Sequence, residues 1–172
     1  MTATAVTATP DLSFAIPTAL DIARIVGRLL CALLIGALVG IERELTHKPA
    51  GLRTHMLVAL GSSLIVVAAV EARMSPSDLS RVIQGLATGI GFLGGGAILK
   101  LTAEHEIHGL TTAASIWTTA AASIAAGLGE VATAALGLAL GLVVLVLLTG
   151  LERRFGARVS SDAANREPPR RG

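Results

Sequence analysis

Five long apolar segments account for most of the chain, and they constrain its fold more than any other feature. They occupy residues 22–41, 55–70, 82–99, 110–128 and 131–151. A helix needs about 20 apolar residues to cross a hydrocarbon layer of about 30 Å; most of these segments reach that length, and the second and third are near its lower limit. Helices buried in a soluble protein are the alternative, but five segments without an amphipathic polar face argue against it. The pattern predicts an all-α membrane protein with five transmembrane helices in residues 21–152.

The composition argues against a soluble domain. Hydrophobic types make up 52% of the 172 residues, another 19 residues are glycine, and 15% are charged. Soluble domains carry about 25% charged residues, and a domain of this size leaves much of its surface exposed. The lipid bilayer is therefore the expected surrounding. Nucleic acid is not an expected partner, because a chain with one Trp, three Phe and no Tyr offers few platforms on which bases stack.

The flanking segments and the charges between the helices indicate an orientation. Residues 1–20 contain two prolines and no basic residue, which favours a flexible or interfacial extension over a cleaved signal peptide. Residues 153–172 are basic, polar and proline-containing, as is typical of a disordered tail. Ten of the 14 Lys and Arg residues lie on the side of this tail. Because cytoplasmic loops carry the excess of Lys and Arg, we expect the N-terminus outside and the tail in the cytoplasm.

Glycines supply the main packing signal. Pairs four residues apart share a helix face and allow close approach of membrane helices; they are Gly36/Gly40, Gly85/Gly89, Gly91/Gly95 and Gly137/Gly141. The third segment also contains a run of three glycines, Gly94–Gly96. Such a run can kink or break the helix, and broken helices often line substrate sites in transporters. Tight packing against the first and fourth helices is the alternative.

The fourth segment carries a stripe of hydroxyl side chains. Thr111, Ser115, Thr119 and Ser123 recur every four residues. Hydroxyls on one face of a membrane helix either bond to helix carbonyls and neighbouring helices or line a polar path. Trp117, the only tryptophan, lies near the middle of this segment, and we expect it to pack inside the bundle.

Charged residues mark both ends of the first segment. Arg28 is separated from Glu42 by 13 residues. These residues make about 20 Å of helix, which is too short to span the hydrocarbon core of the membrane. Arg28 therefore either extends its side chain to the interface or pairs inside the membrane; the acidic candidates on its side are Asp21, Glu71 and Asp78.

At the other end, residues 40–53 mix charges of both signs between two apolar segments. Glu42 and Glu44 are candidate ligands for Mg2+, which keeps most of its waters and takes one or two protein carboxylates. An ordinary solvated helix end with local ion pairs is the alternative.

The histidines do not make an enzyme site. Residues 105–108 read HExH, one residue shorter than the HExxH pattern that places two zinc ligands on one helix face. His55 and Ser62 are seven residues apart on one face, but no GxSxG elbow accompanies them. We expect no enzymatic activity and no cofactor, with Mg2+ as the one ligand to consider.

Four sequence blocks together resemble the MgtC/SapB family of bacterial inner-membrane proteins. The blocks are ALLIGALVGIERE (32–44), AGLRTHMLVALGSSL (50–64), GIGFLGGGAILK (89–100) and GLTTAASIWTTAA (109–121). Their order and spacing cover most of the hydrophobic body, roughly residues 28–129.

The resemblance implies a compact five-helix domain in the bacterial inner membrane and a role in growth under Mg2+ limitation. It does not imply Mg2+ transport. Many members carry a cytoplasmic α/β domain after the helices, whereas this sequence ends about 20 residues after its fifth apolar segment. Regulation lodged in that domain is then expected to be absent or supplied by a partner.

Functional residues are expected where the motifs match the family blocks, together with Arg28. At the cytoplasmic mouth they are Glu42, Arg43, Glu44, Arg53, Thr54 and His55. Within the membrane they are Gly91, Phe92, Gly94, Thr111, Thr112 and Trp117. The leading hypothesis is adaptation to Mg2+ limitation through modulation of another membrane component, with a membrane-protein partner or a homo-oligomer. The alternatives are a transporter or channel for an ion or small solute, and a membrane enzyme using His55.

Overall fold

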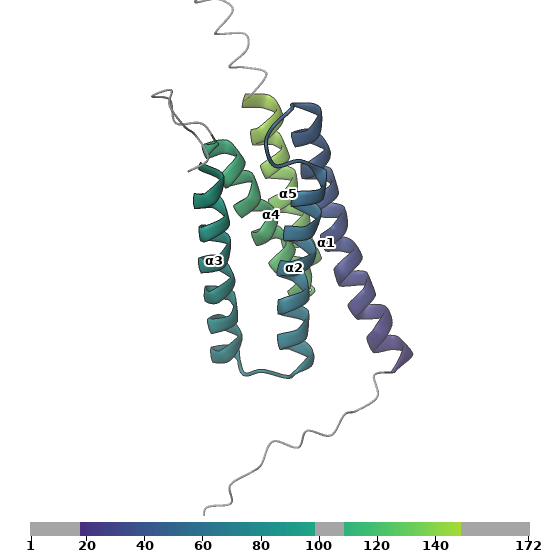
Figure 1. Ribbon diagram of the computed structural model, residues 1–172. Coiled ribbons are helices and arrows are strands. Elements are labelled where there is room, and N and C mark those ends of the chain that lie inside the picture. Colours follow the sequence, from purple (N-terminus) through teal and green to yellow (C-terminus); the bar gives the residue numbers. More distant parts are fainter. Residues whose placement is uncertain (1–17, 99–108, 149–172) are drawn as a thin grey trace, which may run out of the picture.

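The computed structural model describes residues 18–98 and 109–148, which form five α-helices (Figure 1). The helices are α1 (Ala19–Leu45), α2 (Leu52–Glu71), α3 (Pro76–Ile98), α4 (Leu110–Leu128) and α5 (Val131–Val143), and α5 continues into a π-helix, η1 (Val144–Leu148). The expectation of an all-α fold with five helices is confirmed.

Local sequence signals explain several helix ends. Thr18 and Asp21 form a reciprocal capping box that starts α1, which satisfies two backbone N–H groups that have no partner inside the helix. Gly129 ends α4 with a φ of 90°, a left-handed conformation that glycine adopts without strain. Because α5 begins two residues later at Val131, α4 and α5 form a tight helical hairpin.

Glycines bring α1, α2 and α4 into close contact. A Cβ atom added to Gly36 would lie 2.6 Å from the His55 carbonyl oxygen, and one added to Gly40 would lie 2.7 Å from Leu52 Cα. A Cβ atom added to Gly127 of α4 would lie 3.0 Å from the Ser63 carbonyl oxygen of α2. Because glycine has no side chain, the backbones of the three helices approach one another closely at these positions.

The buried core is small and partly polar, and large apolar side chains point outward. Most buried apolar residues are alanines, joined by a few Val, Ile and Leu side chains and by several Ser and Thr hydroxyls. Leu34 is 64% exposed and Leu140 is 66% exposed. This is the distribution expected when lipid rather than water surrounds a bundle. By length and composition, α1 and α2 are the two described helices that are long and apolar enough to cross a membrane.

The third helix settles one of the two alternatives for its glycine run. It is continuous from Pro76 to Ile98, through Gly94–Gly96, so a break is absent from the described residues. The irregular turn lies instead at the end of α5, in η1. An α-helix keeps its hydrogen bonds without side chains, so glycine lowers helix stability without ending the helix.

The third helix also lies at the edge of the bundle (Figure 1). It packs mainly on α4 and less on α2, and only Ile90 and Gly94 are buried along it. Gly94 fits against Ala113, whereas an added Cβ at Gly85 or Gly89 would meet nothing within 4 Å. Helix α3 thus packs on α4, as expected, but the expectation that it also packs tightly on α1 is wrong.

Three sequence-based predictions fall on residues outside the described ranges. They are the N-terminal extension up to residue 17, the HExH motif at 105–108 and the basic tail from 153 to 172.

Candidate functional site

A buried polar cluster joins the ends of three helices. Arg43 comes from the last turn of α1, His55 from the first turn of α2, and Thr112 and Ser115 from the first turns of α4. All four side chains are at most 3% exposed. Burial of a charged and an aromatic polar group among small residues makes this cluster the leading candidate site, because such groups are retained inside a membrane protein at a cost in stability.

Arg43 holds α1 against α4. Its Nη2 donates a hydrogen bond to Thr112 Oγ1 at 3.4 Å, and its Nη1 lies 3.7 Å from Glu42 Oε2. The Nε atom is buried and has no hydrogen-bond partner within residues 18–98 and 109–148. The guanidinium is therefore only partly satisfied, and its charge is balanced by a carboxylate whose side chain is 12% exposed.

His55 joins α2 to α4. Its Nδ1 lies 3.0 Å from the Gly51 carbonyl oxygen and its Nε2 lies 3.2 Å from Ser115 Oγ. A carbonyl only accepts hydrogen bonds, so Nδ1 carries a proton. The Ser115 hydroxyl has one proton and two acceptors within reach, His55 Nε2 and the Thr112 carbonyl oxygen at 2.8 Å. The protonation of Nε2 thus decides which helix receives the Ser115 hydrogen bond. Ser115, rather than Ser62, is the hydroxyl that contacts this histidine.

The two glutamates predicted as magnesium ligands have separate partners. Glu42 pairs with Arg43, while Glu44 Oε2 accepts a hydrogen bond of 3.1 Å from the Leu52 backbone N–H at the start of α2. A Cβ atom on Gly51 would collide with the Glu44 carboxylate, the end of a flexible side chain that would have to shift to admit it. Among the described residues, no three His, Cys, Asp or Glu side chains are grouped to hold a metal.

Buried hydroxyls continue from the cluster along the contact between α2 and α4. Thr119 Oγ1 donates to the Ser115 carbonyl oxygen at 2.8 Å. The hydroxyls of Ser62, Ser63 and Ser123 are buried and have no hydrogen-bond partner among the described residues. Of the stripe predicted on the fourth segment, Ser115, Thr119 and Ser123 are therefore buried in the bundle, and Thr111 is exposed.

Arg28 lies toward the opposite end of α1, beside the end of α4. A Cβ atom on Gly129 would lie 3.2 Å from Arg28 Nη2. A cation at this place is favoured by the partial negative charge at a helix C-terminus. Of the described residues, Asp21 pairs with Arg24 at 3.6 Å and none forms an ion pair with Arg28. The buried Nη1 of Arg28 has no hydrogen-bond partner.

The remaining predicted residues do not gather into one site. Arg53, Thr54, Gly91 and Phe92 are exposed, and Phe92 reaches 82%. Gly94 is buried against α4, as described above. Trp117 is 45% exposed, so the expectation that it packs inside the bundle is wrong. A ring of its size does not fit among the alanines that face α1 and α2.

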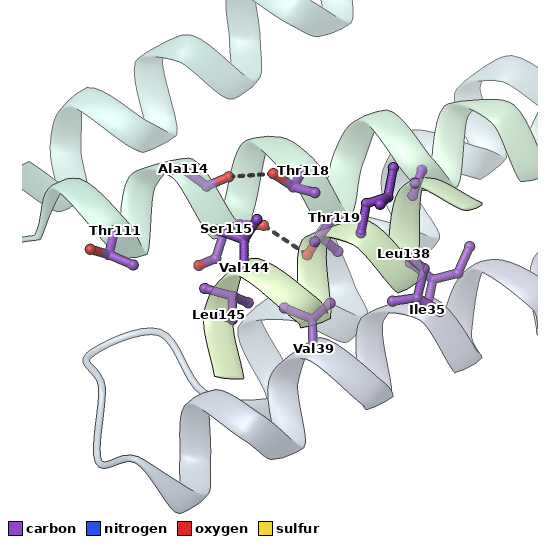
Figure 2. A pocket seen from close by; sticks show the side chains of 14 residues that line it. Ile35, Val39, Thr111, Ala114, Ser115, Thr118, Thr119, Leu138, Val144 and Leu145 are labelled. Carbon is purple, nitrogen blue, oxygen red and sulfur yellow. Dashed lines mark hydrogen bonds between the residues drawn. The ribbon is translucent and has the colours of Figure 1, made fainter. Parts of the chain in front are cut away.

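Next to the cluster, an apolar groove of about 310 Å³ lies between α1, α4 and α5 (Figure 2). Its lining includes Ile35 and Val39 of α1, Thr111 and Ala114 of α4, and Leu138 of α5. Ser115 and Thr119 also line it, which places the groove directly beside the histidine contact.

The groove was not predicted from the sequence. The Gly137/Gly141 pair signals close packing of the fifth helix, and a Cβ atom on Gly141 would indeed lie 3.0 Å from Thr118 Cγ2. The space beside that contact depends on the angle between α1 and α5, which a pattern along one helix does not specify.

Comparison with known proteins gives one family. Residues 29–154 match the model of the MgtC family. Protein SrpB of Synechococcus elongatus is 43% identical over 139 residues, which cover 73% of the chain and 74% of SrpB. Protein MgtC of Salmonella paratyphi A is 35% identical over 139 residues, covering 80% of the chain and 58% of that protein. Protein MgtC of Brucella abortus is 40% identical over 122 residues, which cover 70% of the chain and 49% of that protein. The chain thus spans about half the length of these MgtC proteins, and no solved structure matches it.

Proposed function

Because the chain belongs to the MgtC family of membrane proteins, we propose that it acts in adaptation to Mg2+ limitation by modulating another component of the bacterial inner membrane. The MgtC family is not a known enzyme family. The proposal treats all five helices as membrane-spanning, with the N-terminus outside. Arg43 and the starts of α2 and α4 then lie on the cytoplasmic side.

The packed interior is the observation that favours modulation over transport. The hydroxyls of Ser115 and Thr119 bond to carbonyls of their own helix at 2.8 Å each. Glycine contacts close the α1–α2 and α2–α4 interfaces. A protein that carries a hydrated ion needs polar groups that face a water-filled space, and the groove beside α5 is apolar.

The edge position of α3 supports action on a partner. Its exposed surface carries Phe92 and several glycines with open space around them. Small residues on a lipid-facing helix permit association with another membrane helix. A membrane-protein partner or a second copy of the chain fits this surface.

Growth of a deletion strain across a range of Mg2+ concentrations tests the proposal. We expect the deletion to slow growth at low Mg2+ only, and the wild-type gene to restore it. Arg43→Met should restore growth poorly, while the exposed variant Arg81→Met, outside the predicted functional residues, should restore it fully. Equal growth of the deletion and wild-type strains at every Mg2+ concentration would remove the proposed role.

Transport is the second candidate function, and the three unpartnered hydroxyls of Ser62, Ser63 and Ser123 favour it. Purified protein in vesicles that enclose a Mg2+-sensitive dye separates the two functions. Modulation predicts the same dye signal as in empty vesicles under an imposed Mg2+ gradient. A protein-dependent signal that Arg43→Met abolishes would establish transport instead.

A further inference from the structure

We propose that the groove between α1, α4 and α5 is a binding site for one acyl chain of a membrane phospholipid, a function separate from the proposed role in Mg2+ adaptation. Figure 2 shows the side chains that line this groove, with Ile35, Val39 and Leu138 on one side and Thr111, Ala114 and Thr118 of α4 on another.

The chemistry of the lining selects hydrocarbon. The lining is almost wholly apolar, and two of its hydroxyls are already engaged: Thr118 Oγ1 donates to the Ala114 carbonyl oxygen at 2.9 Å, and Thr119 Oγ1 donates to the Ser115 carbonyl oxygen at 2.8 Å (Figure 2). None of the described residues that line the groove is charged. An ion or polar solute would lose its hydration there without compensation, whereas an alkyl chain loses nothing.

The length and volume of the groove suit a single acyl chain of a lipid in one leaflet. Along α4 the lining runs from Thr111 to Ala122, which at 1.5 Å per residue is about 16 Å. One leaflet of a bilayer contributes about 15 Å of hydrocarbon. An apolar cavity of about 150 Å³ holds one benzene molecule, so 310 Å³ has room for about twice that amount of carbon. A helix about 10 Å wide over the same length would need about 1,250 Å³, so a partner helix does not enter.

The groove is continuous with the surface that faces the bilayer. Leu140 and Val144 line it and are 66% and 54% exposed, and they adjoin the outward residues Leu136 and Val143 of α5. A chain from the surrounding lipid therefore reaches the groove laterally without crossing a polar region. The groove lies in the half of the bundle that carries Arg43, because Val39 is one turn from Arg43 and Thr111 precedes its partner Thr112.

Native mass spectrometry of the full chain tests the site. The protein is purified from membranes in mild detergent and washed with excess detergent to remove surface lipid. We expect the wild type to retain one phospholipid per chain. Ala114→Phe fills the groove from an exposed position. If the ring displaces about two methylenes of the acyl chain, at about 0.8 kcal/mol each, retention should fall about tenfold, since a factor of ten corresponds to about 1.4 kcal/mol.

Ala121→Phe is the matched control, because Ala121 is an exposed alanine of α4 outside the lining. It should retain lipid as the wild type does. Circular dichroism and size-exclusion elution establish that both variants fold. Equal retention in the two variants, or no retained lipid in the wild type, would overturn the proposal.

A photoreactive probe identifies the occupant independently. Wild-type protein is reconstituted in phosphatidylethanolamine and phosphatidylglycerol vesicles that contain a trace of phosphatidylethanolamine with a diazirine in its acyl chain. After irradiation, lipid adducts should resist dilution with unlabelled lipid at Ile35 and Leu138 but not at outward Leu57, which is 69% exposed. Adducts to a second polypeptide in place of lipid, or equal dilution at all three residues, would contradict an acyl-chain site.

Discussion

Helices α1 and α3 contain the same four-residue glycine spacing, but it serves helix packing only in α1. On α1, Gly36 and Gly40 meet the backbone of α2, so that an added Cβ would lie within 2.7 Å of it. On α3, Gly85 and Gly89 have the same separation, and an added Cβ would meet nothing. A four-residue glycine repeat therefore shows that a face can be approached closely, and the fold decides whether another helix of the chain approaches it.

The two regions also differ in polar content. The contact of α1 and α2 with α4 buries Arg43, His55 and several hydroxyls, while α3 buries only Ile90 and Gly94. A buried, partly satisfied polar network specifies one arrangement of the helices that contribute to it. We therefore expect α1, α2 and α4 to form the stable unit and α3 to open at lower free energy.

The largest difference in stability between the two regions is expected when a glycine is replaced by a bulky residue. Gly36→Leu drives a side chain into the His55 carbonyl and should lower the free energy of unfolding by about 3 kcal/mol or more. Gly89→Leu, in open space, should not lower it and should raise it by up to about 1 kcal/mol, because leucine is a better helix former than glycine. Unfolding in mixed micelles, followed by far-UV circular dichroism, measures both. Equal losses would show that α3 packs as closely as α1.

The buried cation gives the next largest effect. Arg43→Met removes the donor to Thr112 and the counterion of Glu42, and should cost about 1–3 kcal/mol. Arg53→Met, at an exposed position of α2, is the control and should cost less than about 0.5 kcal/mol.

Adding Glu42→Gln to Arg43→Met should recover part of that loss, because the unpaired carboxylate disappears. The same unfolding measurement applies to the single and double variants. A double variant as unstable as the sum of two independent losses would mean that the pair at 3.7 Å contributes nothing to the cluster.

A smaller effect is expected at the contact with the histidine. Ser115→Ala removes the only side-chain hydrogen bond from α4 to His55, and should cost about 1 kcal/mol. Thr118→Val removes a hydroxyl that bonds to its own helix at an exposed position, and should cost less. Unfolding curves of the two variants rank these hydroxyls. A larger loss for Thr118→Val would place the important hydroxyl in the groove rather than in the cluster.

The sequence predicts the helices well because their signal lies along the chain. Apolar runs give five helices in order, but the first helix was predicted to start near residue 22, because the capping box of Thr18 and Asp21 that starts α1 was not recognised. The sequence left open whether the glycine run breaks α3, because glycine propensity alone does not show that a hydrogen-bonded helix tolerates residues that lack side chains.

The candidate site is harder to predict because it depends on contacts between helices. Arg43 and His55 were chosen as residues of a solvated mouth, yet both are buried. Charge alone does not separate a surface arginine from one that fits against Thr112, 69 positions away in sequence. Trp117 was placed inside for its position near the middle of the segment, but the buried faces of α4 consist of small side chains apart from Ile116.

The smallest expected effect changes sign between the two regions. Gly40→Ala adds one methyl group that would lie 2.7 Å from Leu52 Cα, so α1 and α2 must separate slightly and stability should fall by about 1 kcal/mol. Gly89→Ala adds the same methyl group in open space, and should raise stability by up to about 1 kcal/mol, because alanine is the better helix former. Parallel unfolding measurements give both signs in one experiment. A loss at Gly89 would mean that a neighbour covers α3 in the folded protein, since a methyl group that meets nothing has no other way to destabilise a helix.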